Sequence, residues 1–162
     1  MPHQRLTRAE LLGGGAASLA AIVLLRRSSI AADHFEVSLS DGQWRKRLNP
    51  ARYEILRHAG TEPAWSSPLE YEHRRGTYSC AGCNLALFSS TTKFESGTGW
   101  PSFYAPLPNA VRTKPDFSYI EERTEVLCRR CGGHLGHVFN DGPKPTGLRY
   151  CMNGLALIFT PK

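Results

Sequence analysis

A chain of 162 residues with 41% hydrophobic residues is long enough for one domain with a buried core and too short for two. Its formal net charge is +6, but residues 1–31 contain four arginines and one glutamate, so the remaining residues carry only half of that charge. Such a small charge argues against a phosphate-binding face for nucleic acid. Fifteen glycines and eleven prolines, with short β-rich runs, favour a turn-rich, mainly β domain.

The N-terminal segment has the features of an export signal. Residues 11–25 are uncharged and largely apolar, which is short of the roughly 20 residues of a membrane-spanning helix. Arg5 and Arg8 precede this stretch, and Ser29-Ile30-Ala31 is a small-x-small cleavage site. Residues 7–13 are similar to the start of a twin-arginine signal, although the two arginines are three positions apart.

We therefore expect residues 1–31 to be an export signal or a membrane anchor, and residues 32–162 to form one domain. The domain would then be exported, periplasmic or tethered to a membrane. Two arginines directly after the apolar stretch resist translocation. A mis-chosen start codon, which would leave the protein cytoplasmic, remains the alternative.

Two short helices are expected between residues 32 and 70, on the outside of a sheet. Ser40 or Asp41 can cap the first helix, because a side-chain oxygen at that position accepts a free backbone N–H. Asn49-Pro50 can open the second, which Gly60 ends. The following residues lack periodicity and predict a wrapping loop in which Trp65 is a packing anchor.

Two CxxC pairs predict a structural zinc site. Each pair is expected in a turn between strands: residues 76–79 and 85–88 flank the first pair, and residues 119–127 precede the second. Four thiolates fill a tetrahedral zinc site and leave no position for a reacting water. Two disulfides or redox pairs are the alternative. The predicted ligands are Cys80, Cys83, Cys128 and Cys131.

The fifth cysteine, Cys151, is left over once the others are paired. In an extended strand Arg149, Cys151 and Asn153 project from one face, which gives the thiol a cation and an amide as neighbours. A neighbouring cation favours the thiolate, which is the nucleophilic form. Equally, Arg149 could pair with a surface carboxylate while Cys151 is a core residue or a disulfide partner for another molecule.

Two histidines follow the second CxxC pair. On a regular strand His134 and His137, three positions apart, would face opposite ways, but Gly136 permits a bulge that turns both rings to one side. We expect them to be hydrogen-bonding catalytic groups. Structural histidines, or ligands of a second metal, are the alternatives.

A glycine-rich stretch, residues 96–103, contains the remaining candidate residue, Trp100, which we expect to bind the substrate. Its glycines let the backbone pass close to a ligand, while Trp100 offers a flat apolar wall suited to a thioether methyl group. A tight turn with Trp100 in the core is the alternative.

Taken together, four motifs occur in a characteristic order. They are the two CxxC pairs, Ser96-Gly97-Thr98-Gly99-Trp100-Pro101-Ser102-Phe103, Gly133-His134-Leu135-Gly136-His137-Val138-Phe139 with Asp141-Gly142-Pro143, and Arg149-Tyr150-Cys151-Met152-Asn153. This combination, spanning about residues 35–160, resembles the B-type methionine sulfoxide reductases. The resemblance implies two antiparallel sheets with short N-terminal helices, one structural zinc ion away from the site, and reduction of the R epimer of methionine sulfoxide, free or in oxidised proteins. We expect the protein to be a monomer.

The resemblance also implies roles for the candidate residues. Cys151 would attack the sulfoxide sulfur and become a sulfenic acid, and Arg149 would lower the pKa of its thiol. Trp100 and Phe139 would bind the substrate and its methyl group. The sulfoxide oxygen would be polarised and protonated, through water, by His134, His137 and Asn153.

Thr98 stands where many relatives carry a cysteine that resolves the sulfenic acid, and the chain has no sixth cysteine. We therefore expect a one-cysteine enzyme that is regenerated by an external thiol, either a thioredoxin-like protein or a small thiol. Two other functions compete: a zinc-ribbon module that binds nucleic acid or protein, and a metal-dependent hydrolase with His134 and His137 as ligands. The low charge of the domain argues against the first, and the second needs another metal.

Overall fold

A computed structural model describes residues 34–118 and 122–162 of the chain. The predicted export segment, 1–31, and the first residues of the strand expected at 119–127 lie outside this description. Within the described ranges, no helix is long and apolar enough to cross a membrane.

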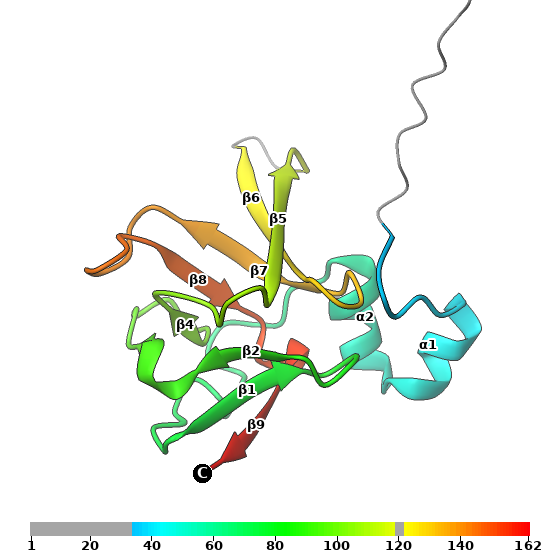
Figure 1. The fold of residues 1–162 in the computed structure, drawn as a ribbon, viewed down its shortest axis with the longest axis horizontal. Helices are drawn as coiled ribbons and strands as arrows, with labels where there is room; N and C mark the ends of the chain where they lie inside the picture. Colours follow the sequence, from blue (N-terminus) through cyan, green and yellow to red (C-terminus); the bar gives the residue numbers. More distant parts are fainter. Residues whose placement is uncertain (1–33, 119–121) are drawn as a thin grey trace, which may run out of the picture. The chain divides into compact units, whose positions relative to one another are not determined.

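Both predicted helices are present, and they lie together beside the sheets (Figure 1). Helix α1 (Asp41–Arg47) begins after Ser40, whose side chain caps it as expected. Helix α2 (Pro50–His58) begins after Asn49, which caps it from its side chain. The second helix ends at His58, and its cap is Ala59 instead of the predicted Gly60, because Ala59 adopts the left-handed conformation with φ of 53°.

The strands form two antiparallel sheets, as expected (Figure 1). The smaller sheet has the order β2-β1-β9 and consists of β1 (Gly76–Cys80), β2 (Ala86–Ser89) and β9 (Leu157–Pro161). The larger sheet has the order β3-β4-β8-β7-β6-β5. Its strands are β3 (Lys93–Phe94), β4 (Ser102–Phe103), β5 (Val111–Asp116), β6 (Arg123–Cys128), β7 (His134–Phe139) and β8 (Arg149–Met152). Short 3₁₀ turns, η1 (Ser90–Thr92) and η2 (Gly154–Ala156), precede β3 and β9.

Three fully buried aromatic side chains join the two sheets. Phe103 of the larger sheet stacks on Phe88 of the smaller one, with ring centroids 4.4 Å apart. It also meets Tyr78 edge-on at 4.9 Å. Aromatic pairs in these arrangements gain energy beyond the burial of their surface. Because Phe103 follows the Trp100 loop, this packing fixes the loop against the core.

Trp65, expected as a packing anchor of the wrapping loop, packs on Gly99 but is not buried in the core. Its side chain is 52% exposed, and its backbone adopts φ of 66°, a left-handed conformation that a bulky residue rarely occupies. The backbone N–H of Trp65 donates to the carbonyl oxygen of Gly99 at 2.7 Å. The loop is therefore attached both through this hydrogen bond and through one side of the indole, while the rest of the residue is exposed to solvent.

Candidate active site

Cys151 lies on β8, between two neighbouring strands of the larger sheet. Its cross-strand partners are Ser102 on β4 and His137 on β7. The backbone N–H of Met152 donates to the carbonyl oxygen of Pro101 at 2.9 Å, which continues the pairing into the glycine-rich loop. Strand pairing alone therefore brings two motifs to the thiol. They are the glycine-rich stretch, about fifty residues before Cys151, and the histidine motif, fourteen residues before it.

A cavity of about 120 Å³ opens at Cys151. Of the residues predicted from the sequence, Trp100, His137, Phe139 and Asn153 line it together with the thiol. It is small, partly apolar and placed at one cysteine, which suits a compact group such as a methyl sulfoxide. Its full lining consists of Thr61, Trp100, Arg123, Gly136, His137, Phe139, Cys151, Met152 and Asn153.

The thiol of Cys151 is held mainly in its protonated form. Burial raises its pKa, because a charged thiolate is poorly solvated there. A hydrogen bond from Thr98, whose Oγ1 lies 3.8 Å from Sγ, and attraction to Arg149 lower the pKa but do not outweigh burial. Arg149 therefore lowers the pKa of the Cys151 thiol, as expected. Because burial raises this pKa by more, the resting thiol is not acidic.

Arg149 makes contacts on both sides of its guanidinium group. It forms a bidentate ion pair with Asp141, with Nε to Oδ1 and Nη2 to Oδ2 distances of 2.8 Å each. Its guanidinium carbon also lies 4.4 Å from the centroid of the Phe139 ring. Arg149 thus pairs with a carboxylate, which the sequence left open as an alternative, and it also attracts Cys151.

The predicted bulge at Gly136 is confirmed. The pairing of β6 with β7 shifts by one residue, so that Leu127 opposes His134 while Glu125 opposes His137. Both rings consequently lie on one face, with centroids 5.4 Å apart. Gly136 has φ of 153°, and a Cβ atom there would lie 2.1 Å from the carbonyl oxygen of Cys151. No larger residue fits without moving the strand that carries the thiol.

His137 is the histidine that lines the cavity. Its Nε2 lies 2.7 Å from Oδ2 of Asp116, which also accepts from Nη2 of Arg123 at 3.0 Å. Hydrogen bonds from Ser118 and then from His137 hold the pKa of Asp116 well below its usual range, so that this carboxylate is ionised and can only accept. Burial lowers the pKa of His137 despite the carboxylate. The ring is therefore neutral at pH 7, with its proton on Nε2.

His134 is placed differently. It is buried at 3% exposure, and its Nδ1 lies 2.7 Å from Oε1 of Glu125. Although burial acts in the opposite direction, hydrogen bonds from His134 and Lys114 hold the pKa of Glu125 below its usual value. His134 lines a separate cavity with these two residues, and not the one at Cys151. Its ring contacts the ring of His137 in a T-shaped arrangement, and its Nε2 is buried without a hydrogen-bond partner among the described residues.

Asn153 uses its side-chain amide to hold the backbone around the cavity. Its Oδ1 accepts from the backbone N–H of Glu62 at 3.0 Å, and its Nδ2 donates to the carbonyl oxygen of Leu135 at 3.3 Å. The carbonyl oxygen of Glu62 in turn accepts from Nε1 of Trp100 at 3.1 Å. Asn153 therefore positions the loop that fixes Trp100, while one side of it faces the cavity.

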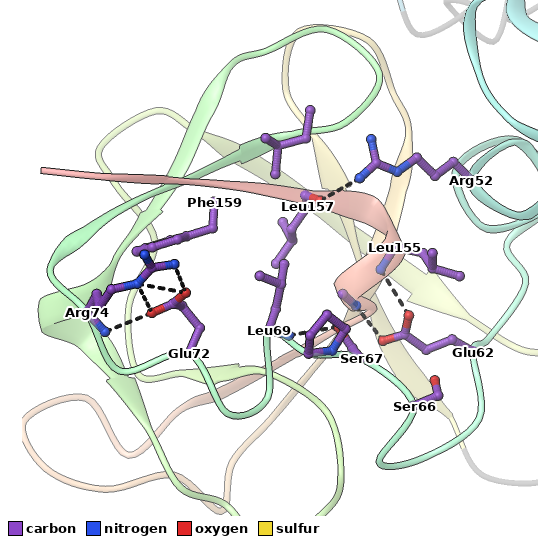
Figure 2. Close-up of a pocket in the computed structure, with 13 residues that line it drawn as sticks. Arg52, Glu62, Ser66, Ser67, Leu69, Glu72, Arg74, Leu155, Leu157 and Phe159 are labelled. Carbon is purple, nitrogen blue, oxygen red and sulfur yellow. Dashed lines mark hydrogen bonds and ion pairs between the residues drawn. The ribbon is translucent and has the colours of Figure 1, made fainter.

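The buried carboxylate of Glu62 ties the same loop to the turn after Cys151. It accepts from the backbone N–H groups of Gly154 and Leu155, the second at 2.9 Å, as Figure 2 shows. Burial raises the pKa of Glu62, and these two hydrogen bonds act against that rise. Glu62 lines the larger cavity drawn in Figure 2, and its backbone is hydrogen-bonded to Asn153, which lines the cavity at Cys151.

The four predicted metal ligands lie together, and all are buried. Each CxxC turn closes alike: the backbone N–H groups of Asn84 and Gly132, both at positive φ, donate to the carbonyl oxygens of Cys80 and Cys128. All four sulfurs lie within 4.8 Å of one another, and two pairs are separated by 3.5 and 3.7 Å.

These separations suit a metal ion. A tetrahedral Zn²⁺ with bonds of about 2.3 Å holds its sulfurs about 3.8 Å apart, whereas a disulfide brings them to about 2.05 Å. The cluster can therefore hold a metal ion and is not a pair of disulfides. In the described part of the chain it is the only group of three or more His, Cys, Asp or Glu residues arranged in this way, and it includes neither histidine.

Several residues at the site carry no signal in the sequence. Asp116 reaches His137 from β5, and Arg123 on β6 donates to Asp116. Thr61 and Glu62 come from the loop after α2. None of them belongs to a spaced pattern. They are recruited by sheet register and by long-range main-chain hydrogen bonds, which a local reading of the sequence does not detect.

Comparison with known proteins gives a consistent result. Residues 48–161 match the SelR domain family. The chain is 57% identical over 127 residues to the peptide methionine sulfoxide reductase MsrB of Leptospira interrogans, covering 78% of this chain and 97% of that one. It is 55% identical over 124 residues to the proteins of the same name from Methanosarcina barkeri and Thiobacillus denitrificans, covering 76% of this chain and 87% and 94% of theirs.

Proposed function

The chain belongs to the SelR-domain family of B-type peptide methionine sulfoxide reductases, oxidoreductases that act on methionine R-sulfoxide, and we propose that it works through a sulfenic acid on Cys151. The observation that carries this proposal is the cavity in which Cys151, His137, Trp100 and Phe139 meet. It places one nucleophile, one proton carrier and an apolar wall around a space that suits a methyl sulfoxide.

In the proposed reaction, the sulfur of Cys151 attacks the sulfoxide sulfur. This attack forms a transient S–S bond. The S–S bond and the sulfur–oxygen bond of the substrate then break as the oxygen, with the proton that the thiol supplied, is transferred to the sulfur of Cys151. The products are methionine and one sulfenic acid, so that the substrate is reduced by two electrons and the cysteine is oxidised by two. No external proton or reductant enters this half of the cycle.

Proton transfer is assigned to His137. A neutral imidazole whose Nε2–H is held by Asp116 keeps a lone pair on Nδ1, which can take the thiol proton and return it, through water, to the sulfoxide oxygen. His134, which lies behind this ring and is bonded to Glu125, is a positioning residue in this scheme. Asn153 likewise acts mainly by fixing the loop of Trp100.

Substrate binding is assigned to the apolar part of the cavity. Trp100 and Phe139 would contact the methyl group of the sulfoxide. Arg149, held by Asp141 and stacked on Phe139, would attract the developing thiolate. Its fixed position means that this attraction needs no rearrangement when the thiol loses its proton.

Regeneration is assigned to an external thiol. The chain has five cysteines, and four of them form the buried cluster. Two equivalents of a thiol, supplied by a thioredoxin-like protein or a small molecule, would return Cys151 to its reduced form and release water and a disulfide. Repair of oxidised proteins by a monomer follows as the biological role, and export of residues 32–162 remains our proposal for its location.

The metal is proposed to be one structural Zn²⁺ held by Cys80, Cys83, Cys128 and Cys131. When bound, it would join the turn after β1 to the turn after β6 and so connect the two sheets. Four sulfur ligands leave it no open position, so it takes no part in the reaction.

The test uses purified protein, dithiothreitol and the separated R and S epimers of methionine sulfoxide. We expect turnover of the R epimer alone, and none in the Cys151→Ser variant with unchanged zinc content and thermal unfolding. Equal turnover of both epimers, or activity in the variant, would contradict the proposal.

A further inference from the structure

The cavity drawn in Figure 2 has no part in the proposed reaction. Its volume of about 640 Å³ lies within the range of about 300–1,000 Å³ that is typical of small-molecule sites. Its walls come from α2, from the loop of residues 62–74 and from the segment formed by η2 and β9. It shares none of its described lining residues with the cavity at Cys151. It is therefore a separate space that can take a ligand of its own.

Glu62 places a buried carboxylate in this cavity without a cation to balance it. The residue is only 4% exposed, and its two carboxylate oxygens accept from the backbone N–H groups of Gly154 and Leu155. No Lys, Arg or His among the described residues forms an ion pair with it. Buried charges are normally paired, and each carboxylate oxygen can accept a second hydrogen bond. Glu62 can therefore accept from a cationic group of a ligand.

Arg52 brings a positive charge to the same cavity, and no carboxylate balances this charge either. The recorded contact of its guanidinium group is a hydrogen bond of 3.4 Å from Nη2 to the carbonyl oxygen of Leu157. In the part of the chain that the structure describes, it has no ion-pair partner. A guanidinium group has five N–H donors, arranged so that two of them can meet one carboxylate. Arg52 can therefore bind an anionic group of a ligand.

The two opposite charges are fixed close together but do not pair with each other. Glu62 is bonded to the N–H of Leu155, and Arg52 to the carbonyl oxygen of Leu157, only two residues further along the chain. Figure 2 shows the two charged side chains on either side of Leu155. Opposite charges that face one cavity without meeting are complementary to a small molecule that carries both an ammonium and a carboxylate group.

The rest of the cavity offers apolar surface and no further unpaired charge. Leu69, Leu157 and Phe159 supply apolar side chains beside the two charged ones (Figure 2). A second guanidinium group, that of Arg74, is already occupied by Glu72. Its Nε lies 3.0 Å from Oε1 of this carboxylate, and its Nη2 lies 2.6 Å from Oε2. The cavity thus suits a zwitterion whose side chain is apolar.

We propose that this cavity is a binding site for a free α-amino acid with an apolar side chain. The ammonium group would donate to Glu62, the carboxylate would accept from Arg52, and the side chain would lie on Leu69 and Phe159. An internal residue of a polypeptide has neither charge, so the site selects free amino acids. Methionine belongs to this class and serves as the probe. No residue of the cavity at Cys151 takes part, so the site does not depend on the proposed reaction.

The experiment titrates three compounds into the full-length, zinc-loaded Cys151→Ser protein and follows its backbone amide signals by NMR. They are L-methionine, L-methioninamide, which lacks the carboxylate, and N-acetyl-L-methionine, which lacks the ammonium group. The test variant is Arg52→Met in the same background. The matched control is Arg74→Lys, which replaces the guanidinium group that Glu72 already occupies and keeps its charge. Thermal unfolding verifies that both variants are folded.

We expect L-methionine to shift the amide signals of Gly154 and Leu155 in a saturable way. Arg52→Met should raise the dissociation constant of L-methionine about tenfold and change that of L-methioninamide by less than about twofold, because only the first compound has a carboxylate to lose its partner. N-acetyl-L-methionine should bind the unsubstituted site more weakly than L-methionine. Arg74→Lys should leave every dissociation constant unchanged.

Three results would overturn the inference. Shifts confined to Trp100 and Gly136 would place methionine in the cavity at Cys151. Equal weakening of L-methionine and L-methioninamide by Arg52→Met would show that this arginine acts on the structure and not on the carboxylate. The third is the absence of any saturable shift. Since the Cys151→Ser protein performs no turnover, each result holds whether or not the proposed reaction occurs.

Discussion

The hydroxyl oxygen of Thr98 lies 3.8 Å from the sulfur of Cys151. This hydrogen bond lowers the pKa of the thiol against the effect of burial. A hydroxyl cannot form a disulfide, so Thr98 stabilises the thiolate of Cys151 without being able to bond to it covalently.

The first prediction removes this hydroxyl. Thr98→Val should lower the single-turnover rate at pH 7 by about tenfold, since a hydrogen bond to a charged group contributes about 1.5–3 kcal/mol and 1.4 kcal/mol corresponds to a factor of ten. Thr98→Ser, which keeps the hydroxyl, is the matched control and should stay near the wild-type rate. Rapid-quench measurement of methionine formation provides the test, and an unaffected valine variant would show that the contact has no role.

The second prediction concerns pH. Burial raises the pKa of Cys151, and the thiolate is the reactive form, so the fraction of reactive enzyme grows as pH rises toward that pKa. The single-turnover rate should therefore increase with pH by up to about tenfold per unit and level off above about 8.5, the usual thiol value. Stopped-flow measurements between pH 6 and 10 test this. A plateau already reached at pH 6 would mean that the resting thiol is acidic.

The third prediction separates the two histidines. His137 lines the cavity and carries the proton, so His137→Gln should lower kcat by at least about a hundredfold, within the range of general acid–base catalysis. His134→Gln should lower kcat by less than about tenfold. Its main effect should be on stability, because it breaks the buried contact with Glu125, at a cost of about 1–3 kcal/mol. Steady-state kinetics and thermal unfolding of both variants decide, and equal kinetic losses would contradict the assignment.

The fourth prediction concerns the cysteine cluster. Structural zinc binding contributes about 10–16 kcal/mol in small domains, which matches or exceeds the whole stability of about 5–15 kcal/mol expected for such a chain. Cys128→Ser, or removal of zinc with a chelator, should therefore unfold the domain at room temperature. Metal analysis should give one zinc per chain for the wild type. A metal-free protein with an unchanged melting temperature would show that the four thiols suffice without the ion.

Much of this architecture follows from local sequence signals. Ser40 and Asn49 start helices because their side chains satisfy free N–H groups, and each CxxC pair lies in a turn that is closed by a hydrogen bond to the carbonyl oxygen of its first cysteine. Gly136 predicts the bulge because no other residue tolerates that backbone so close to the next strand. These are short-range constraints, and each is visible in a few residues.

Other parts of the site depend on long-range register and could not be predicted. Asp116 reaches His137 only because β5, β6 and β7 pair in one alignment, and Glu62 reaches the turn after Cys151 across ninety-two residues. The exposure of Trp65 depends on its main-chain hydrogen bond to Gly99, which no feature of the sequence predicts. Burial of the Cys151 thiol, which reverses the expected shift of its pKa, also requires the packed structure.

The central claim is that Cys151 completes each cycle without a partner inside the chain. Its most direct test is one turnover with methionine R-sulfoxide in the absence of thiols, followed by dimedone trapping, mass spectrometry and zinc analysis. We predict one dimedone adduct on the peptide that contains Cys151, one zinc retained per chain and no internal disulfide. An intramolecular disulfide between Cys151 and any of the four other cysteines, formed with zinc still bound, would contradict the account.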